Sequence, residues 1–365
     1  MSKITYLILP KSKFIKFTTM TNADFTKTSS DQKIAKLGSD KILQLKTLQI
    51  DQKDSLVFWV ENYFDKMIFK GKVKTKKAKK MDLQKFLTFF ANDIGTYHID
   101  NWTPSVSKGF QQLLLSHISK STGQKYKATT INRIFATLKH CASWIAERRS
   151  FAAGNPFEGV KDLMLEEPDW NGLTDRQLML LRGAIDRRMK ICSGKNQNPL
   201  LEAAVFFTLL HTGLRKFELC SLTIDQYYNK GFHYIRRKGN MITKRVFLPE
   251  DARQKIDEYL KWREDVQDQV NSNFFFINKN YEPLSETAVT RLCQRISRQA
   301  CVNLTEDEKF ILEPHQLRHT CLKRANDKYG MSFAKKISGN IGDRELYRYT
   351  APSQKEVEEK VEGLF

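Results

Sequence analysis

The chain has 365 residues, 41% of them apolar, with 61 lysines and arginines against 41 aspartates and glutamates. This length and apolar content allow two domains with a core each, and they exclude a chain that is mainly disordered. The formal net charge of +20 favours a polyanionic partner, of which nucleic acid is the common kind. No apolar stretch approaches the roughly 20 residues that cross a membrane, so we expect no membrane partner.

The beginning of the chain and the cysteines indicate the cytoplasm. The short apolar run within residues 1–10 has no small-residue cleavage site after it, and lysines follow. The cysteines show no Cys-x-x-Cys pair and no regular spacing, which favours buried reduced thiols over disulfides or zinc ligands. They are Cys141, Cys192, Cys220, Cys293, Cys301 and Cys321.

Residues 1–50 are polar and show no sustained period, which predicts an N-terminal arm or a small appended element. A helical block begins at Leu56, and a lysine run follows it. Such runs often form only a solvated loop, but the position of this one between helices of a basic domain favours contact with DNA. The run comprises Lys70, Lys72, Lys74, Lys76, Lys77, Lys79 and Lys80.

An amphipathic helix is predicted from Thr129, where Thr129 or Thr130 can provide the N-cap. Its other face is basic, as expected of a helix that lies on the phosphates of a duplex. The apolar face comprises Ile131, Ile134, Phe135, Leu138, Cys141 and Ile145, and the basic face Arg133, Lys139 and Arg148. The stretch at 154–156 ends this block, and residues 166–169 are typical of a linker. We therefore expect a helical DNA-binding domain over residues 51–165.

The second domain is predicted over residues 170–350. It opens with a capping box at 174–177, and the apolar helix at 200–210 stops at Gly213 before a short helix at 215–222. Two strands follow at 232–236 and 243–248, joined through Lys238-Gly239-Asn240, and a helix then starts at Pro249. A further strand is predicted at 274–277, and the rest is helical. The expected fold class is mainly α with a small antiparallel β-sheet.

Several residues of this domain have the chemistry to cut a phosphodiester. An arginine pair can hold the non-bridging oxygens of a phosphate, and a tyrosine beside it can attack the phosphorus. Arg215 is one such arginine, although a structural ion pair with Glu218 is an alternative for it. His315 and Arg318, three residues apart, share a helix face. His315 and His319 lack a third ligand for a metal, so we expect no metal and no cofactor.

The order of these motifs resembles the tyrosine recombinase, or phage integrase, family. The motifs follow one another in a fixed order. They are Thr-Gly-Leu-Arg-x-x-Glu-Leu over 212–219, a basic hairpin, His-x-Leu-Arg-His over 315–319, a glycine-led turn, and Tyr-Thr at 349–350. The resemblance covers roughly residues 55–360 and is specific over 205–350. It implies a two-domain DNA clamp, in which a helical core-binding domain joins an α+β catalytic domain. It also implies site-specific recombination through a covalent 3′-phosphotyrosyl intermediate, without ATP or metal.

The resemblance also assigns roles. It makes Arg215 the first catalytic arginine, with Glu218 in support, and it matches His315 and Arg318 to the His-x-x-Arg pair that His319 follows. The stretch at 237–240, Arg-Lys-Gly-Asn, looks like the Gly-Lys-Gly-Asn that the family often has, so Lys238 is the expected hairpin lysine and Lys244 the fallback.

The nucleophile usually lies nine residues beyond the histidine of a Gly-His pair, which favours Tyr349 over Tyr347. Here Asn340 follows Gly339, where the family usually has His or Trp to donate a hydrogen bond to the scissile phosphate. An amide can still donate such a bond. The departure leaves open a catalytically weak or inactive DNA-binding relative, and a hairpin-forming telomere resolvase with the same chemistry is another alternative.

Residues 351–365 are predicted as a C-terminal tail helix, with Val357, Val361 and Leu364 on one side. In the family such a tail commonly packs into a neighbouring protomer. We therefore expect double-stranded DNA with a specific recombination site as the partner, bound by a dimer at each site and a tetramer in the synapse. The alternative is that the tail folds back on its own domain. Integration of a mobile element, excision, dimer resolution and inversion all fit this pattern.

Overall fold

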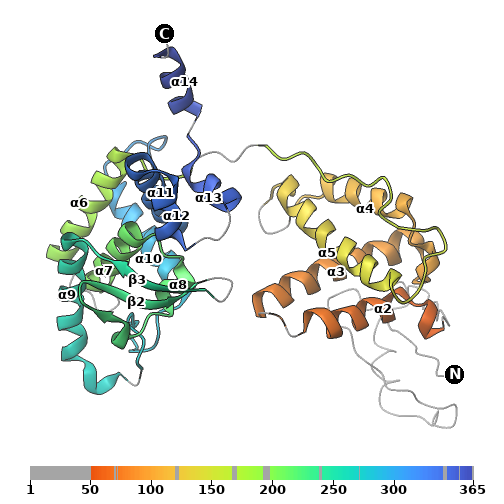
Figure 1. Ribbon diagram of the computed structural model, residues 1–365, viewed down its shortest axis with the longest axis horizontal. Coiled ribbons are helices and arrows are strands. Elements are labelled where there is room, and N and C mark those ends of the chain that lie inside the picture. Colours follow the sequence, from red (N-terminus) through yellow and green to blue (C-terminus); the bar gives the residue numbers. More distant parts are fainter. Residues whose placement is uncertain are drawn as a thin grey trace, which may run out of the picture. The chain divides into compact units, whose positions relative to one another are not determined.

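The computed structural model describes residues 51–69, 71, 73–119, 123–166, 171–191, 198–237, 241–270, 272–339, 343–352 and 354–363 (Figure 1). The chain divides into two compact units, Met1–Glu166 and Glu167–Phe365. No helix in these ranges is long and apolar enough to cross a membrane. Several predictions concern positions outside the described residues, namely the arm at 1–50, Lys70, Lys72, Cys192, Lys238, Asn340 and Leu364, and the side chain of Lys74.

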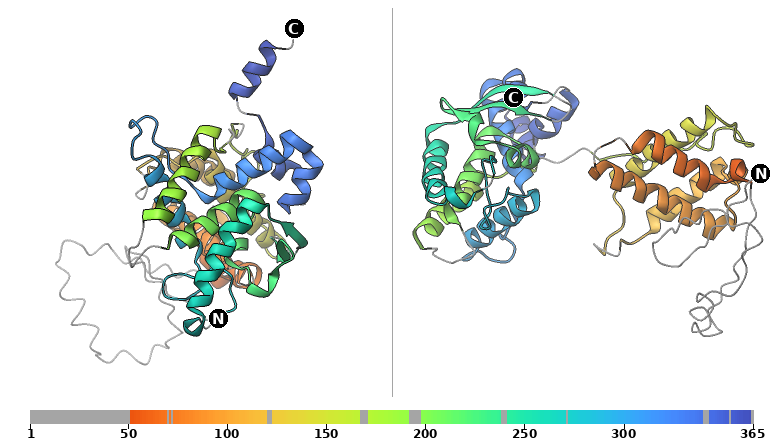
Figure 2. Two further views of the ribbon diagram at one scale, coloured as in Figure 1. Left: turned by 90° about the vertical axis from the view of Figure 1, so that its left-hand side faces the viewer. Right: turned by 90° about the horizontal axis from the view of Figure 1, so that it is seen from below.

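The first unit is helical. Its long helices α3 and α5 lie side by side (Figures 1 and 2). The core between them is rich in aromatic rings: Phe86 packs 4.8 Å from Trp102 and 5.2 Å from Phe110, measured between ring centroids. The elements are η2 (Gln52–Asp54), α2 (Leu56–Tyr63), η3 (Phe64–Ile68), α3 (Val73–Ile94), η4 (Ile99–Asn101), α4 (Pro104–Ser116) and α5 (Ala128–Ala146).

Two local predictions in this unit are wrong. The lysine run is not a segment between helices, because α3 begins at Val73 and carries Lys76, Lys77, Lys79 and Lys80 in its first turns. Lysine is a good helix former, so a lysine-rich stretch can open a helix whose later turns are buried. The N-cap of α5 is Lys127, without a side-chain cap hydrogen bond, in place of a threonine.

The second unit surrounds the buried helix α7. Eleven residues of α7 are buried, so this helix has no solvent-exposed face and lies at the centre of the unit. The neighbouring helices α6, α9, α10 and α11 pack against it (Figure 1). The helices are α6 (Asp175–Ile191), α7 (Pro199–Thr212), α8 (Lys216–Cys220), η5 (Ile224–Gln226), α9 (Glu250–Asp265), η6 (Gln267–Gln269), α10 (Glu286–Ala300), α11 (Pro314–Tyr329), α12 (Met331–Ser338), α13 (Asp343–Thr350) and α14 (Gln354–Glu362).

The sheet of this unit has three antiparallel strands in the order β1-β2-β3. The strands are β1 (Tyr227–Tyr228), β2 (Gly231–Arg236) and β3 (Ile242–Phe247). The predicted hairpin is therefore present, with Phe232 opposite Val246 and Ile235 opposite Thr243. Residues 274–277 form only isolated bridges, Thr223 to Phe274 and Ile277 to Pro283, in place of the predicted strand. The predicted fold class, mainly α with a small antiparallel sheet, is confirmed.

Sequence capping signals correspond to observed helix ends. Thr174 and Gln177 form the predicted capping box before α6, with N–H to side-chain distances of 3.0 and 3.2 Å. Gly213 ends α7 with a left-handed φ of +60°, which glycine adopts without strain. None of the five described cysteines forms a disulfide, and Cys141, Cys293 and Cys301 are buried.

Candidate active site

The turn from α7 to α8 brings α11 close to the first predicted arginine. A Cβ on Gly213 would lie 3.4 Å from Cys321 Sγ and 3.5 Å from Leu322 Cδ2, so glycine leaves room for α11 at this point. The Gly213 carbonyl accepts a hydrogen bond from Arg318 Nη1, which joins the turn to α11. Arg215 then provides the N-cap of α8, directly after the turn.

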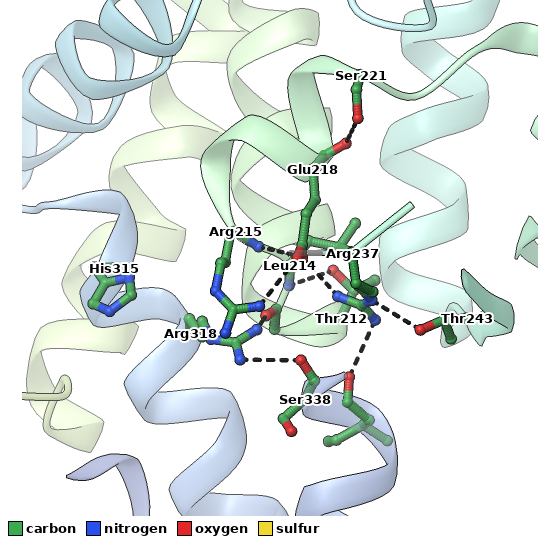
Figure 3. Close-up of polar contacts among 12 residues, drawn as sticks. Thr212, Leu214, Arg215, Glu218, Ser221, Arg237, Thr243, His315, Arg318 and Ser338 are labelled. Atoms are coloured by element: carbon green, nitrogen blue, oxygen red, sulfur yellow. Dashed lines mark hydrogen bonds and ion pairs between the residues drawn. The ribbon is translucent and has the colours of Figure 1, made fainter. Parts of the chain in front are cut away.

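Arg215, Glu218 and Arg237 form a buried cluster, here called the site triad (Figure 3). Glu218 Oε1 lies 3.1 Å from Arg215 Nη1, and Oε2 lies 2.7 Å from Arg237 Nη1. Glu218 Oε2 also accepts the backbone N–H of Arg215 at 2.9 Å, so one carboxylate holds both the main chain and the side chain of this arginine. The side chains of Glu218 and Arg237 are fully buried, whereas that of Arg215 is 13% exposed.

Arg318 is also fully buried, which is unusual for an arginine. Besides its bond to Gly213, its Nη2 donates to the carbonyl of Ser338 at 3.0 Å. Ser338 is the last residue of α12, so Arg318 ties α11 to the end of the helix that precedes α13. Figure 3 shows the guanidinium groups of Arg215 and Arg318 lying beside each other.

Helix α13 places Tyr349 against these groups. The Tyr349 hydroxyl lies 3.2 Å from His315 Nε2, and the Arg318 guanidinium lies 5.0 Å from the centre of the tyrosine ring. The His319 ring packs 4.6 Å from the Tyr349 ring on the same side of α11 as His315. The side chain of Tyr347 is 55% exposed.

The pKa values of both histidines are lowered, which favours the neutral imidazole near pH 7. Burial, followed by the charges of Arg318, Arg215 and Lys216, lowers the pKa of His315 below its ordinary value of about 6.5. Burial, with His315 and Arg318 nearby, lowers the pKa of His319 to about 4. A neutral imidazole at His315 can accept a proton from the phenol that it faces.

The structure thus gathers Arg215, Glu218, His315, Arg318, His319 and Tyr349 from three helices, α8, α11 and α13. Lys238 and Asn340 lie outside the described residues, and Lys244 lies on β3, within the same hairpin. Arg237 is the residue that the sequence analysis missed. Its buried ion pair joins positions 19 residues apart, and an arginine beside a lysine in a hairpin is typical of an exposed cation.

The basic residues predicted to contact DNA along this helix have acidic partners in their own unit; Arg133 and Lys139 lie on α5, whereas Arg148 lies beyond its end at Ala146. Arg133 makes two hydrogen bonds of 2.5 and 3.0 Å to Asp82, whose side chain is 2% exposed. Lys139 lies 2.6 Å from Asp162. Arg148 lies 3.0 Å from Glu147 and 4.0 Å from the Trp144 ring centre. This face therefore carries less uncompensated positive charge than the sequence indicates. On α3, Lys77 is exposed, and Lys76 Nζ lies 4.5 Å from the Phe69 ring centre.

Comparison with known proteins supports the motif pattern. The sequence profile of the Phage integrase family matches residues 180–356. A tyrosine recombinase of Agathobacter rectalis is 25% identical over 54% of this chain and 62% of its own length. Tyrosine recombinase XerC of Treponema denticola is 25% identical over 56% of this chain and 66% of its own. The chain thus matches less than two thirds of the length of either relative.

A solved structure shares the fold. A lambda integrase dimer bound to a COC′ core site superposes with a TM-score of 0.60 at 15% identity, covering 81% of this chain and 95% of that one. The fold, the profile match and the curated relatives agree with the order of the motifs. Residues 180–356 therefore match the Phage integrase family, and the curated relatives of this chain are tyrosine recombinases.

Proposed function

We propose that this protein is a site-specific DNA recombinase that cleaves and rejoins DNA strands through a covalent 3′-phosphotyrosyl intermediate on Tyr349. The observation that carries the proposal is the 3.2 Å contact between the Tyr349 hydroxyl and His315 Nε2, beside the buried guanidinium of Arg318. A phenol that faces a neutral imidazole and a fixed cation is set up to attack a phosphate. Tyr347, two residues earlier, is largely exposed, which supports Tyr349 as the nucleophile.

In this mechanism Arg215 and Arg318 bind the scissile phosphate. Their donors stabilise the charge that builds on its equatorial oxygens in the transition state more than they stabilise the ground state. The Tyr349 oxygen forms a bond to phosphorus as the bond to the 5′ oxygen breaks. His315 takes the phenolic proton, which is needed because a phenol has a pKa of about 10. Lys238 delivers a proton to the leaving 5′ oxygen, a role assigned from its place in the sequence.

The intermediate preserves the energy of the phosphodiester bond. The 5′ hydroxyl of an incoming strand can attack the phosphotyrosine and release Tyr349, which exchanges one phosphate ester for another. The joining step therefore requires neither ATP nor a metal ion. Rejoining to a different strand gives recombination, whereas rejoining to the original strand gives relaxation.

We also propose that the first unit and the second clamp double-stranded DNA at a specific site in the cytoplasm, on the nucleoid. The net charge of +20 supports this partner. Within the first unit, Lys76 and Lys77 at the start of α3 are stronger phosphate contacts than Arg133, whose charge is balanced by the buried Asp82.

Assembly on DNA is proposed as two protomers at each site and four in the synapse. The lambda integrase of similar fold is a dimer on its core site. Helix α14 supports the proposal, because Val357 and Val361 are 38% and 55% exposed and present apolar surface that a second protomer can cover. The first turn of α14 is tied to its own unit by Glu356, whose carboxylate lies 3.0 Å from Lys323 Nζ.

A nicked suicide substrate tests the central claim, because loss of the short strand beyond the nick traps the covalent adduct. The wild type is expected to form a denaturation-resistant protein–DNA adduct, and Tyr349→Phe is expected to form none. Tyr347→Phe is the matched control, since it removes the same hydroxyl two residues away, and it should form the adduct at the wild-type rate.

Other outcomes assign the protein differently. A wild type that binds DNA tightly but forms no adduct would be a catalytically inactive DNA-binding relative, the reading that Asn340 favours. An adduct that persists in Tyr349→Phe and disappears in Tyr347→Phe would move the nucleophile to Tyr347. Hairpin-ended products from a duplex site would identify a telomere resolvase with the same chemistry.

A further inference from the structure

The Arg237 side chain, directly after β2, is fully buried. All three nitrogens of its guanidinium donate hydrogen bonds, each to a different element. Nη1 lies 2.7 Å from Glu218 Oε2 on α8, Nε donates to Thr243 Oγ1 on β3 at 2.9 Å, and Nη2 donates to the Ile337 carbonyl on α12 at 3.2 Å (Figure 3). A planar fork of fixed donors defines the relative orientation of the groups it binds. Arg237 thus joins three segments that converge on the proposed active site.

The first consequence concerns the charge of Arg215. Glu218 lies between two guanidinium groups, so the site triad carries a net charge of +1. Without Arg237 the same carboxylate would neutralise Arg215 alone, and the pair would attract a phosphate less strongly. Glu218 would also lose the contact that fixes its Oε2, the oxygen that holds the Arg215 backbone N–H at 2.9 Å. Arg237 therefore affects both the position and the effective charge of Arg215 without facing the phosphate itself.

The second consequence concerns the end of α12. The last carbonyls of a helix lack partners within it and carry partial negative charge. Here Arg237 binds the Ile337 carbonyl and Arg318 binds that of Ser338, so two arginines cap the same helix end. The next residue, Gly339, has a left-handed φ of +63°, and a Cβ there would lie 2.8 Å from Arg237 Nε. The stem of Arg237 therefore occupies the space beside the glycine that precedes Asn340 in sequence.

We propose that Arg237 is a positioning residue of the DNA-cleavage site. It sets the orientation and charge of Arg215 through Glu218, and it fixes the end of α12, from which the chain leads through Asn340 to the helix of Tyr349. Arg237 also immediately precedes Lys238, a proposed catalytic residue, in the sequence. The inference rests on the proposed strand-cleavage function, which it extends to a residue that the family pattern does not require.

The experiment compares Arg237→Met and Arg237→Lys with Arg188→Met and Arg188→Lys. Arg188 is a matched control because it is buried in the same unit and pairs with a buried glutamate, Glu202, at 2.5 Å. Two quantities are measured for each variant: the single-turnover rate of adduct formation on the nicked substrate at saturating protein, and amide hydrogen exchange of peptides covering α12. The dissociation constant for the intact duplex and the folded fraction from circular dichroism are recorded alongside.

Arg237→Met is expected to slow adduct formation by about 10²-fold, the scale seen when a transition-state donor is lost, with duplex affinity changed less than about threefold. Arg237→Lys keeps a charge near Glu218 but lacks the three-way fork, so it should recover part of that rate. Exchange at α12 should rise by about tenfold in both Arg237 variants. The Arg188 variants should keep a rate within about threefold of wild type and show unchanged exchange at α12 relative to the rest of the unit.

Equal rates and equal α12 exchange for the Arg237 and Arg188 variants would overturn the inference. If Arg237→Met does not fold, Arg237→Lys decides, and a wild-type rate with wild-type exchange would count against the proposal. A wild type that forms no adduct would instead refute the proposed function. The exchange measurement on free protein still decides in that case whether Arg237 fixes the end of α12.

Discussion

Two clusters of one glutamate between two arginines lie in the second unit, and they differ in what surrounds them. The site triad joins Arg215 and Arg237 to Glu218 near the end of α7. The second cluster, here called the helix triad, joins Arg188 of α6 and Arg295 of α10 to Glu202 of α7. Glu202 lies 2.5 Å from Arg188 Nε and 2.7 Å from Arg295 Nη1. Both glutamates are almost fully buried.

The difference shows how identical charges can serve packing or chemistry. The helix triad links the three helices α6, α7 and α10, and its less buried arginine, Arg295, is 36% exposed. In the site triad, Arg215 lies beside a second buried guanidinium, that of Arg318 (Figure 3). Two cations side by side repel each other, so a bound anion such as phosphate would relieve the repulsion between Arg215 and Arg318. Burial alone does not distinguish the two clusters, whereas the neighbouring charges do.

The largest expected difference between the triads is in catalysis. Arg215→Met should slow adduct formation on the nicked substrate by about 10³-fold, because it removes a donor to the transition state. Arg295→Met removes the corresponding arginine of the helix triad and should leave the rate within about threefold of wild type. Single-turnover rates at saturating protein measure both. Comparable losses in the two variants would mean that the rate follows the integrity of the fold.

The glutamates should separate stability from catalysis. Glu202→Gln and Glu218→Gln each remove the carboxylate charge that two arginines share, so each should lower the free energy of unfolding by about 3 kcal/mol. Only Glu218→Gln should also slow adduct formation, by about tenfold or more, since it releases Arg215. Denaturant unfolding and single-turnover rates give the two quantities. If Glu202→Gln also slowed adduct formation, the two triads would not differ in their contribution to catalysis.

His319 adds a pH dependence that the arginines lack. Its pKa of about 4 in the folded protein lies below the ordinary value of about 6.5, so the unfolded chain binds the proton first as the pH falls. The stability from a neutral His319 is therefore complete above about pH 6.5 and is lost between there and about pH 4. After discounting for partial exposure we expect a loss of about 2 kcal/mol. His319→Gln should flatten this part of the stability curve, and an unchanged curve would contradict the assignment.

The smallest expected effect concerns two cations of the first unit. Lys77 is exposed, whereas Arg133 is paired with the buried Asp82. Lys77→Met should reduce the slope of log affinity against log salt by about 1 and change unfolding by less than about 0.5 kcal/mol. Arg133→Met should leave the slope of log affinity against log salt unchanged and lower the melting temperature instead. Titrations at several salt concentrations, with melting curves, distinguish the two. A reduced slope for Arg133→Met would restore it as a phosphate contact.

Local signals in the sequence predicted much of the fold. Gly213 ended its helix as expected, Thr174 formed its capping box, and the hairpin strands paired. These features depend on neighbours within a few residues, so a sequence pattern contains them. The predicted strand at 274–277 is wrong because a strand requires a continuous partner, and these residues find only isolated bridges. Partners of that kind are set by the tertiary fold.

The candidate site divides in the same way. The spacing of His315 and Arg318 on one helix, and of Tyr349 from Gly339, could be read from the sequence. Arg237 could not, because its partner Glu218 is 19 residues away and its contact with Ile337 spans 100 residues. Arg133 shows the opposite case: the sequence places it on the polar face of a helix, but its ion pair with Asp82, 51 residues earlier, is visible only in the structure. Charge in a sequence is visible, but its compensation is not.

The packing of Arg237 against Gly339 limits how this protein can diverge. Any side chain at 339 would collide with the arginine stem, and the left-handed backbone there already disfavours one. A relative with a glycine at 237 has no stem in that place, so one of these two obstacles is absent. The two positions, 102 residues apart, are therefore expected to vary together among relatives, with arginine at the first found only with glycine at the second.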